Sequence, residues 1–199
     1  MATQPAVERG SARERLLAAA DELFYAEGVH TVGVDRVVER AGVAKASLYA
    51  IFGSKEGLIR AYLLARDDRT RERMAAELAA RFHTPRERLL GVFEVQGLSF
   101  TDPGFRGCPF LSANAETPPG LSFEEVTEGY RSWLHKLFLD LSREAGAAIP
   151  EDLARQLVLV FDGAGISAWM DRDPTAAKAA RAVAAALVDA AIPRSKRNR

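Results

Sequence analysis

The side chains best suited to chemistry lie in the stretch ERAGVAKASLYAIFGSKEGL. Two lysines, Lys45 and Lys55, flank an apolar run that also carries Ser47 and Tyr49. A lysine can bind a phosphate or a guanine edge, and a hydroxyl can donate a hydrogen bond to a phosphate. The small side chain of Ala46 allows close approach to a thymine methyl group. These residue types together suit contact with double-stranded DNA.

Two very short helices must position these side chains. The apolar spacing and the glycines predict one helix over about 34–40 and another over about 45–51, joined by a turn at Gly42. Such a pair is a helix-turn-helix, whose second helix lies in the major groove of DNA. Leu48 and Phe52, four residues apart, are expected to face the domain, which leaves the polar residues on the outer side.

Each lysine or tyrosine taken alone is also an ordinary surface residue, so the prediction depends on the ordered set. The run AGVAKASLYAIFGSKEGL resembles the helix-turn-helix of TetR-type transcriptional regulators, with AGV, a Lys between small residues, Leu-Tyr, an aromatic Phe and Ser-Lys-Glu in the same order. The resemblance covers about residues 11–60. It implies a homodimer that binds a near-palindromic DNA operator through two recognition helices.

The sequence departs from the family pattern at two helix starts. Gly33 and Ala44 stand where Ser or Thr is common, so a hydroxyl cap and a phosphate contact are weakened at each. Thr31 and Arg36 are reasonable substitutes for these contacts. The predicted DNA-binding residues are Thr31, Arg36, Lys45, Ala46, Ser47, Tyr49 and Lys55.

The rest of the chain is predicted to be helical as well, because strand patterns are nearly absent and helix formers dominate. We expect an all-α fold of about nine helices, with a helix-turn-helix DNA-binding domain over 1–60, a helical ligand-binding and dimerisation domain over 61–192 and a basic disordered tail over 193–199. The other seven helices are expected at about 11–26, 55–80, 85–100, 109–116, 122–144, 150–170 and 174–191.

The composition limits where DNA can bind. The 27 Lys and Arg residues balance the 27 Asp and Glu residues, so any DNA contact must come from a local basic patch. The single cysteine excludes a disulfide within the chain, which fits a reducing cytoplasm. Neither a secretory signal nor an apolar run long enough to span a membrane is present in the sequence, so we expect a cytoplasmic protein without a membrane partner.

Small residues in the last two predicted helices allow close helix packing. Two interpretations stay open: tight packing inside one subunit, or a four-helix bundle between two subunits, which the family resemblance favours. The residues predicted at the dimer interface are Gly163, Ala164, Ala168, Ala180, Val183 and Leu187.

The middle helices are rich in aromatic residues, most of which suit an ordinary core. The resemblance implies a cavity here for a small inducer, and the apolar helix faces suggest a largely apolar molecule. The candidate ligand-binding residues are Phe93, Gln96, Phe100, Phe110, Asn114, Tyr130 and Trp133.

Cys108 has a more specific setting, at the predicted N-cap of a helix, with Pro109 after it and Arg106 two residues before. A helix N-terminus and a nearby cation lower the pKa of a thiol and make it more reactive. The segment resembles the Gly-Cys start of the sixth helix in some TetR-type regulators that sense electrophiles or oxidants. Two interpretations remain, a redox or electrophile sensor and a structural cysteine without a redox role.

The sequence offers no catalytic pattern. We find no phosphate loop, dinucleotide fingerprint, His-Glu metal motif or nucleophile elbow, and the three histidines share no ligand spacing. We therefore expect a DNA-binding regulator that is not an enzyme and needs no metal or cofactor. The alternative is an all-helical protein that binds a small ligand independently of DNA.

Overall fold

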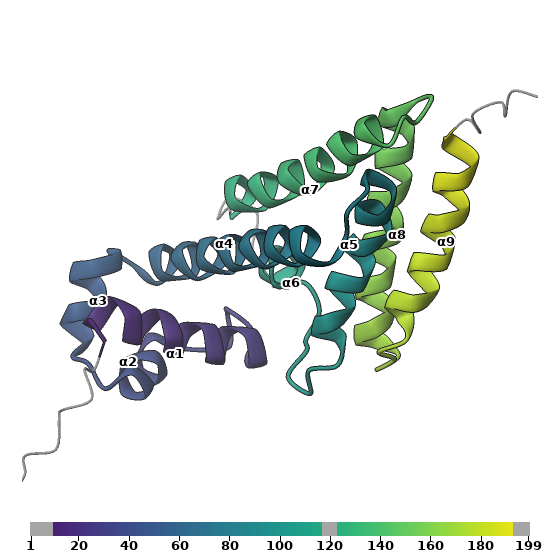
Figure 1. The fold of residues 1–199 in the computed structure, drawn as a ribbon. Helices are drawn as coiled ribbons and strands as arrows, with labels where there is room; N and C mark the ends of the chain where they lie inside the picture. The colour runs from purple at the N-terminus through teal and green to yellow at the C-terminus, as the bar shows by residue number, and fades with distance from the viewer. Residues whose placement is uncertain (1–9, 117–122, 193–199) are drawn as a thin grey trace, which may run out of the picture. The chain divides into compact units, whose positions relative to one another are not determined.

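The computed structural model describes residues 10–116 and 123–192, which form nine α-helices and contain no strand (Figure 1). The all-α prediction is therefore confirmed for this part of the chain. The helices are α1 (Ala12–Glu27), α2 (Val34–Ala41), α3 (Lys45–Phe52), α4 (Lys55–Arg81), α5 (Pro85–Phe100), α6 (Pro109–Glu116), α7 (Glu124–Glu144), α8 (Pro150–Met170) and α9 (Ala176–Ala191). The tail predicted at 193–199 lies outside the described residues.

The described residues form two compact units, and the division falls inside α4. The first unit contains the described residues up to Arg66 and those of 112–123. The second contains 67–111 and the described residues from Glu124 onward. Helices α1, α2 and α3 thus lie wholly in the first unit, and α5, α7, α8 and α9 lie wholly in the second.

The first unit is built on α1, whose start is fixed by a capping box. The Ser11 Oγ accepts a hydrogen bond from the Glu14 N–H at 3.2 Å, and the Glu14 carboxylate accepts one from the Ser11 N–H at 2.7 Å. Such a cap stabilises a helix by about 1 kcal/mol. The apolar face of α1 is buried, and Phe24 meets Tyr62 of α4 edge to face at 5.6 Å.

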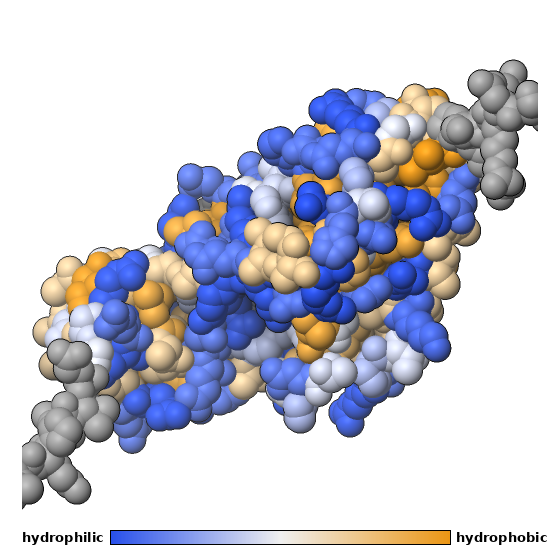
Figure 2. Space-filling view, in the orientation of Figure 1, coloured by the Kyte–Doolittle hydropathy of each residue, from blue (hydrophilic) through white to orange (hydrophobic). Residues whose placement is uncertain are grey.

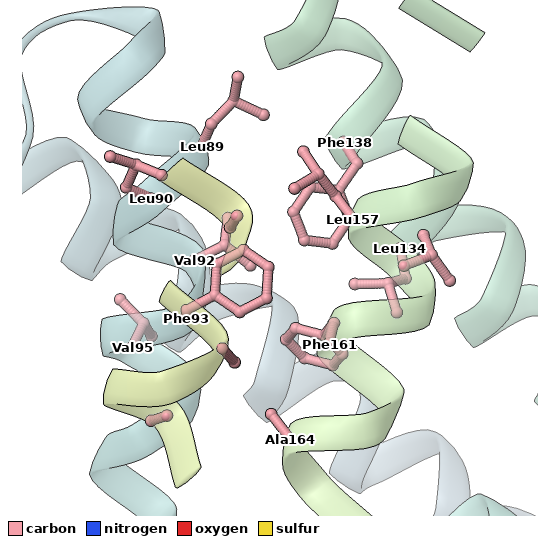
Figure 3. Close-up of a cluster of buried hydrophobic side chains, with 14 of the residues drawn as sticks. Leu89, Leu90, Val92, Phe93, Val95, Leu134, Phe138, Leu157, Phe161 and Ala164 are labelled. Carbon is pink, nitrogen blue, oxygen red and sulfur yellow. The ribbon is translucent and has the colours of Figure 1, made fainter. Parts of the chain in front are cut away.

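The second unit encloses a large hydrophobic core (Figure 3). Helix α8 packs against α7 and α9, and α5 packs against α7, α8 and α9. Phe93 of α5, Phe138 of α7 and Phe161 of α8 meet at its centre, with ring centroids 5.8–6.3 Å apart. Burying each such side chain contributes about 1.5–3 kcal/mol, so this cluster is a principal source of the unit's stability.

The surface of the described residues is mixed in character. Hydrophilic residues cover much of the face seen in Figure 2, with hydrophobic residues interspersed among them. Among the described residues, no helix combines the length and the apolar character needed to cross a bilayer.

Candidate nucleic-acid interface

The turn between α2 and α3 depends on the backbone of Gly42. This residue has φ 62° and ψ 43°, the left-handed conformation that side chains disfavour. Its N–H donates to the Glu39 carbonyl, and the Val43 N–H donates to the Val38 carbonyl at 3.1 Å. These bonds satisfy the last carbonyl groups of α2 and close the helix-turn-helix.

Helix α3 has one covered side and one open side. Leu48 is fully buried, and Phe52 is half-buried beneath the guanidinium of Arg13. On the other side, Ala46 is exposed and Tyr49 is 46% exposed. Lys45 is exposed as well, and Ser47 is half-buried. The structure therefore brings these four predicted residues together on one short helix.

Two of the predicted basic residues, Lys45 and Arg36, form ion pairs with carboxylates. Lys45 Nζ lies 2.8 Å from Asp35 Oδ1, and the bond with Asp35 raises the pKa of Lys45. Arg36 forms two hydrogen bonds with Glu27, at 2.6 and 2.8 Å, which raise the pKa of the guanidinium. Both cations stay charged at neutral pH, and a phosphate would have to replace a carboxylate to engage either of them.

Two further predicted DNA-binding residues, Thr31 and Lys55, lie outside α3. Thr31 is exposed in the loop before α2. Lys55 begins α4, where its Nζ lies 3.4 Å from the His30 carbonyl oxygen, and Ser54 Oγ accepts a hydrogen bond from the Gly57 N–H at 3.0 Å. The weak caps predicted at Gly33 and Ala44 are found, since neither start has a side-chain cap bond.

Sequence reasoning missed Arg15 of α1. Its Nη1 donates hydrogen bonds to the carbonyl oxygens of Gly42 at 3.0 Å and Ala41 at 3.3 Å. The contact joins residues more than 25 positions apart, and no local pattern signals it. An arginine in the first turns of an exposed helix looks like a solvated charge until the turn is folded against it.

The candidate ligand residues fall into several groups. Phe110 stacks on Tyr130 with centroids 4.4 Å apart, and Trp133 lies 5.8 Å from Tyr130. Burial raises the pKa of the Tyr130 hydroxyl well above its usual value, with Cys108 and Asp162 adding to the effect. This hydroxyl is therefore protonated at all physiological pH values.

The other candidates make different contacts. Phe93 belongs to the core described above, and Gln96 Nε2 donates to the Phe161 carbonyl at 2.9 Å. Phe100 is buried against Phe105, with centroids 5.1 Å apart. Asn114 lies in α6, in the part that belongs to the first unit.

Cys108 precedes α6, as predicted, but the direction predicted for its pKa is wrong. Solvent reaches the residue, yet enough protein surrounds the sulfur for burial to raise the pKa of the thiol. Hydrogen bonds from the backbone of Leu111 and Phe110 act in the opposite direction without overcoming burial. Arg106 donates hydrogen bonds to the carbonyls of Pro103 and Phe105.

The residues predicted at the dimer interface separate into two sets. Ala164, Ala168 and Ala180 are buried in the chain's own core, where their small side chains let α8 and α9 approach closely. A contact of these three residues with a partner subunit stays a prediction. Gly163 and Val183 are exposed, and Leu187 is half-buried.

Comparisons with known proteins agree with this geometry. A family model described as bacterial regulatory proteins, tetR family, matches residues 16–62. The crystal structure of SCO4454, a TetR-family transcriptional regulator from Streptomyces coelicolor, is 30% identical with a TM-score of 0.84, over 92% of this chain and 96% of that chain. The sav143 protein of Streptomyces avermitilis, a proposed TetR-type regulator, is 36% identical with a TM-score of 0.75, over 92% and 98%.

Curated relatives match over shorter stretches. The HTH-type transcriptional activator FasR of Mycolicibacterium smegmatis is 46% identical over 55 residues, which are 28% of this chain and 25% of that protein. The HTH-type transcriptional regulator UidR of Escherichia coli (strain K12) is 28% identical over 120 residues, 60% of this chain and 53% of that protein. The chain thus spans about a quarter to a half of the length of these relatives.

Proposed function

The chain belongs to the TetR family of bacterial transcription regulators, and from this premise we propose that it is a homodimeric, ligand-responsive repressor. In this proposal, two copies of α3 enter the major groove at the half-sites of a near-palindromic operator in the cytoplasm. A small inducer bound by the second unit releases the DNA. The DNA-binding domain extends to about residue 60, and the inducer-binding and dimerisation domain extends from there to about residue 192.

One observation carries the DNA-binding part of the proposal. Leu48 is fully buried while Ala46 and Tyr49, on the opposite side of the same helix, are exposed. An 8-residue helix with small and hydroxyl-bearing side chains outward is short and slim enough for the major groove. Lys45 at the start of this helix and Arg36 of α2 can exchange their carboxylate partners for phosphates.

The outer surfaces of α8 and α9 support the dimer. One series of exposed, uncharged residues in α8 recurs at intervals of four, three and four, and one in α9 repeats that spacing with smaller side chains. These residues are Leu159, Gly163, Ile166, Met170, Ala179, Val183, Ala186 and Ala190. Such paired apolar stripes suit a four-helix bundle formed by two subunits. A dimer would place the two recognition helices about 34 Å apart or somewhat more.

The aromatic trio of Phe110, Tyr130 and Trp133 supports an apolar or aromatic inducer. A flat molecule could replace one ring of this stack and keep the contact area. Release through modification of Cys108 is the alternative, and the raised pKa of that thiol favours the non-covalent route. The variant Cys108→Ser separates the two routes. If an electrophile still releases the DNA from this variant, Cys108 is not the sensor.

Helix α4 is the element through which the two units would communicate. In the first unit, Arg66 binds Asp21 of α1 with hydrogen bonds of 2.7 and 3.2 Å. In the second, the buried Asp67 binds Arg71, which also donates to the Gly129 carbonyl of α7 at 3.0 Å. Adjacent residues of one helix thus anchor it in both units. The inducer shifts the equilibrium by its differential affinity for two arrangements.

A gel-shift experiment tests the proposal directly. The wild-type protein should shift duplex DNA taken from beside its own gene. The double variant with Tyr49→Ala and Lys45→Ala should stay folded and cause no shift. Protein that ignores every duplex would favour the rival function, a helical ligand-binding protein that works without DNA.

A further inference from the structure

Arg15 of α1 contacts the turn between α2 and α3, which leads into the helix proposed to bind DNA. Its Nη1 donates to the carbonyl oxygens of Gly42 and Ala41, at 3.0 and 3.3 Å. These carbonyls lie at the C-terminal end of α2, where the backbone leaves acceptors without helical partners and the helix dipole is negative. A cationic donor therefore suits this place better than a neutral one.

The surroundings make the contact specific. Arg15 is half-buried and its Nε atom is fully covered, and of its two bonds to the turn the one to Ala41 is partly buried and the one to Gly42 is exposed. A Cβ at Gly42 would stand 3.8 Å from Nη1, an ordinary contact distance, so the guanidinium lies directly beside the turn. Hydrogen bonds that involve a charged group and are partly shielded from water are stronger than ordinary ones.

Helix α1 also holds the opposite end of α3. The guanidinium of Arg13 lies 5.8 Å from the centroid of the Phe52 ring, the last residue of that helix. Leu48 between them is fully buried. Two arginines from one turn of α1 thus contact the turn that leads into α3 and the last residue of α3, and the core holds the middle of that helix.

We infer that Arg15 is a positioning residue for DNA recognition. By holding the two turn carbonyls, it fixes the angle at which α3 leaves the turn, and with it the direction of Ala46 and Tyr49. It does not itself contact DNA. This inference rests on the proposed function, because it assigns Arg15 a part in the same recognition event.

A first measurement needs no DNA. Amide hydrogen exchange should be compared between wild type, Arg15→Met and Arg88→Met. Arg88 is the matched control, since its Nε donates to the Phe82 carbonyl at 3.2 Å after the end of α4, in the second unit. In Arg15→Met, exchange at the Val43 and Ser47 amides should accelerate about tenfold, and in Arg88→Met it should stay at the wild-type rate.

A second measurement uses the duplex that the wild-type protein retains, at a temperature where every variant is folded. Arg15→Met should bind about tenfold more weakly, with the same slope of affinity against salt, because no phosphate contact is lost. Arg15→Lys keeps the charge and should lie between Arg15→Met and wild type. Arg88→Met should bind as wild type does. Should Arg15→Met not fold, Arg15→Lys carries both measurements.

Three outcomes would overturn the inference. Unchanged exchange at the turn would show that Arg15 does not hold it. Unchanged affinity in folded Arg15→Met would show a role in stability alone, and a salt slope lower by about one would show a direct phosphate contact. A wild-type protein that binds no duplex would refute the proposed function, and the exchange measurement would still decide whether Arg15 holds the turn.

Discussion

The two compact units place their candidate functional residues in opposite environments. In the first unit, Ala46 and Tyr49 lie exposed on a short helix whose buried side does the packing. In the second, Phe93, Phe110 and Tyr130 are buried among the side chains that stabilise the fold. A surface for DNA can therefore change with little effect on stability, whereas a site for an apolar inducer shares its residues with the core.

The largest effect is expected in the core of the second unit. Phe93→Ala should lower the free energy of unfolding by about 3–5 kcal/mol, because it opens a cavity beside Phe138 and Phe161. Denaturant titration measures the loss, and Leu98→Ala, an exposed position of the same helix, should change stability by less than about 0.5 kcal/mol. A loss below about 1 kcal/mol for Phe93→Ala would mean that Phe93 lines an open site and is not core.

In the first unit, a substitution on the DNA-binding surface should weaken DNA binding and leave stability unchanged. Lys45→Ala should weaken operator binding about tenfold and lower the salt slope by about one, with the unfolding midpoint unchanged. Fluorescence anisotropy with a labelled duplex over a range of salt concentrations measures both. Lys136→Ala is the control, since Lys136 is also exposed and paired with an aspartate, Asp140, but in the second unit. An equal loss of DNA affinity in Lys45→Ala and Lys136→Ala would contradict the assignment of DNA binding to the first unit.

A smaller gain of binding is expected when the carboxylate beside Lys45 is neutralised. Asp35→Asn frees the ammonium group for phosphate and should strengthen operator binding a few-fold at low salt. Competition binding against the wild-type protein resolves a change of this size. Glu22→Gln, which removes the carboxylate paired with Arg40 of α2, is the comparison. Weaker binding by Asp35→Asn would show that Asp35 orients Lys45 for DNA and does not compete with it.

The smallest effect concerns acid stability at the start of α5. Hydrogen bonds from the backbone of Thr84 and His83 lower the pKa of Glu87 below its usual 4.5. This stabilisation is complete above the unfolded pKa and is lost as the pH falls through the lower folded value. Thermal melts between pH 6 and about pH 3 should show a shallower decline for Glu87→Gln than for wild type. A parallel decline in both would mean that the carboxylate does not cap the helix.

Most of the fold was predictable because its signals are local. Helices opened by a proline, Pro85–Phe100 and Pro150–Met170, have the limits that the sequence predicts. The last helix begins at Ala176 and not at Pro174, because the Asp173 carboxylate first closes a turn on the Thr175 N–H at 2.8 Å. A side chain that bonds the backbone two residues away is difficult to distinguish from a helix cap in the sequence.

In the candidate DNA-binding site, the sequence predicted only those features that helical spacing determines. The outward direction of Ala46 and Tyr49 follows from helical geometry once Leu48 is taken as buried. The contact of Arg15 with the turn joins distant positions and depends on tertiary packing. The pKa of Cys108 was mispredicted for a related reason, since sequence gives the helix start that lowers it but not the burial that raises it.

The most direct test of the account is selection of bound duplexes from a random DNA pool by the wild-type protein, beside Tyr49→Ala as a folded comparison. We predict that wild type enriches a two-fold symmetric site with half-site centres about one helical turn apart or somewhat more, and that the variant enriches it weakly or not at all. Enrichment of the same site by both proteins, or of no site by wild type at low salt, would contradict the claim that the exposed side of α3 reads DNA.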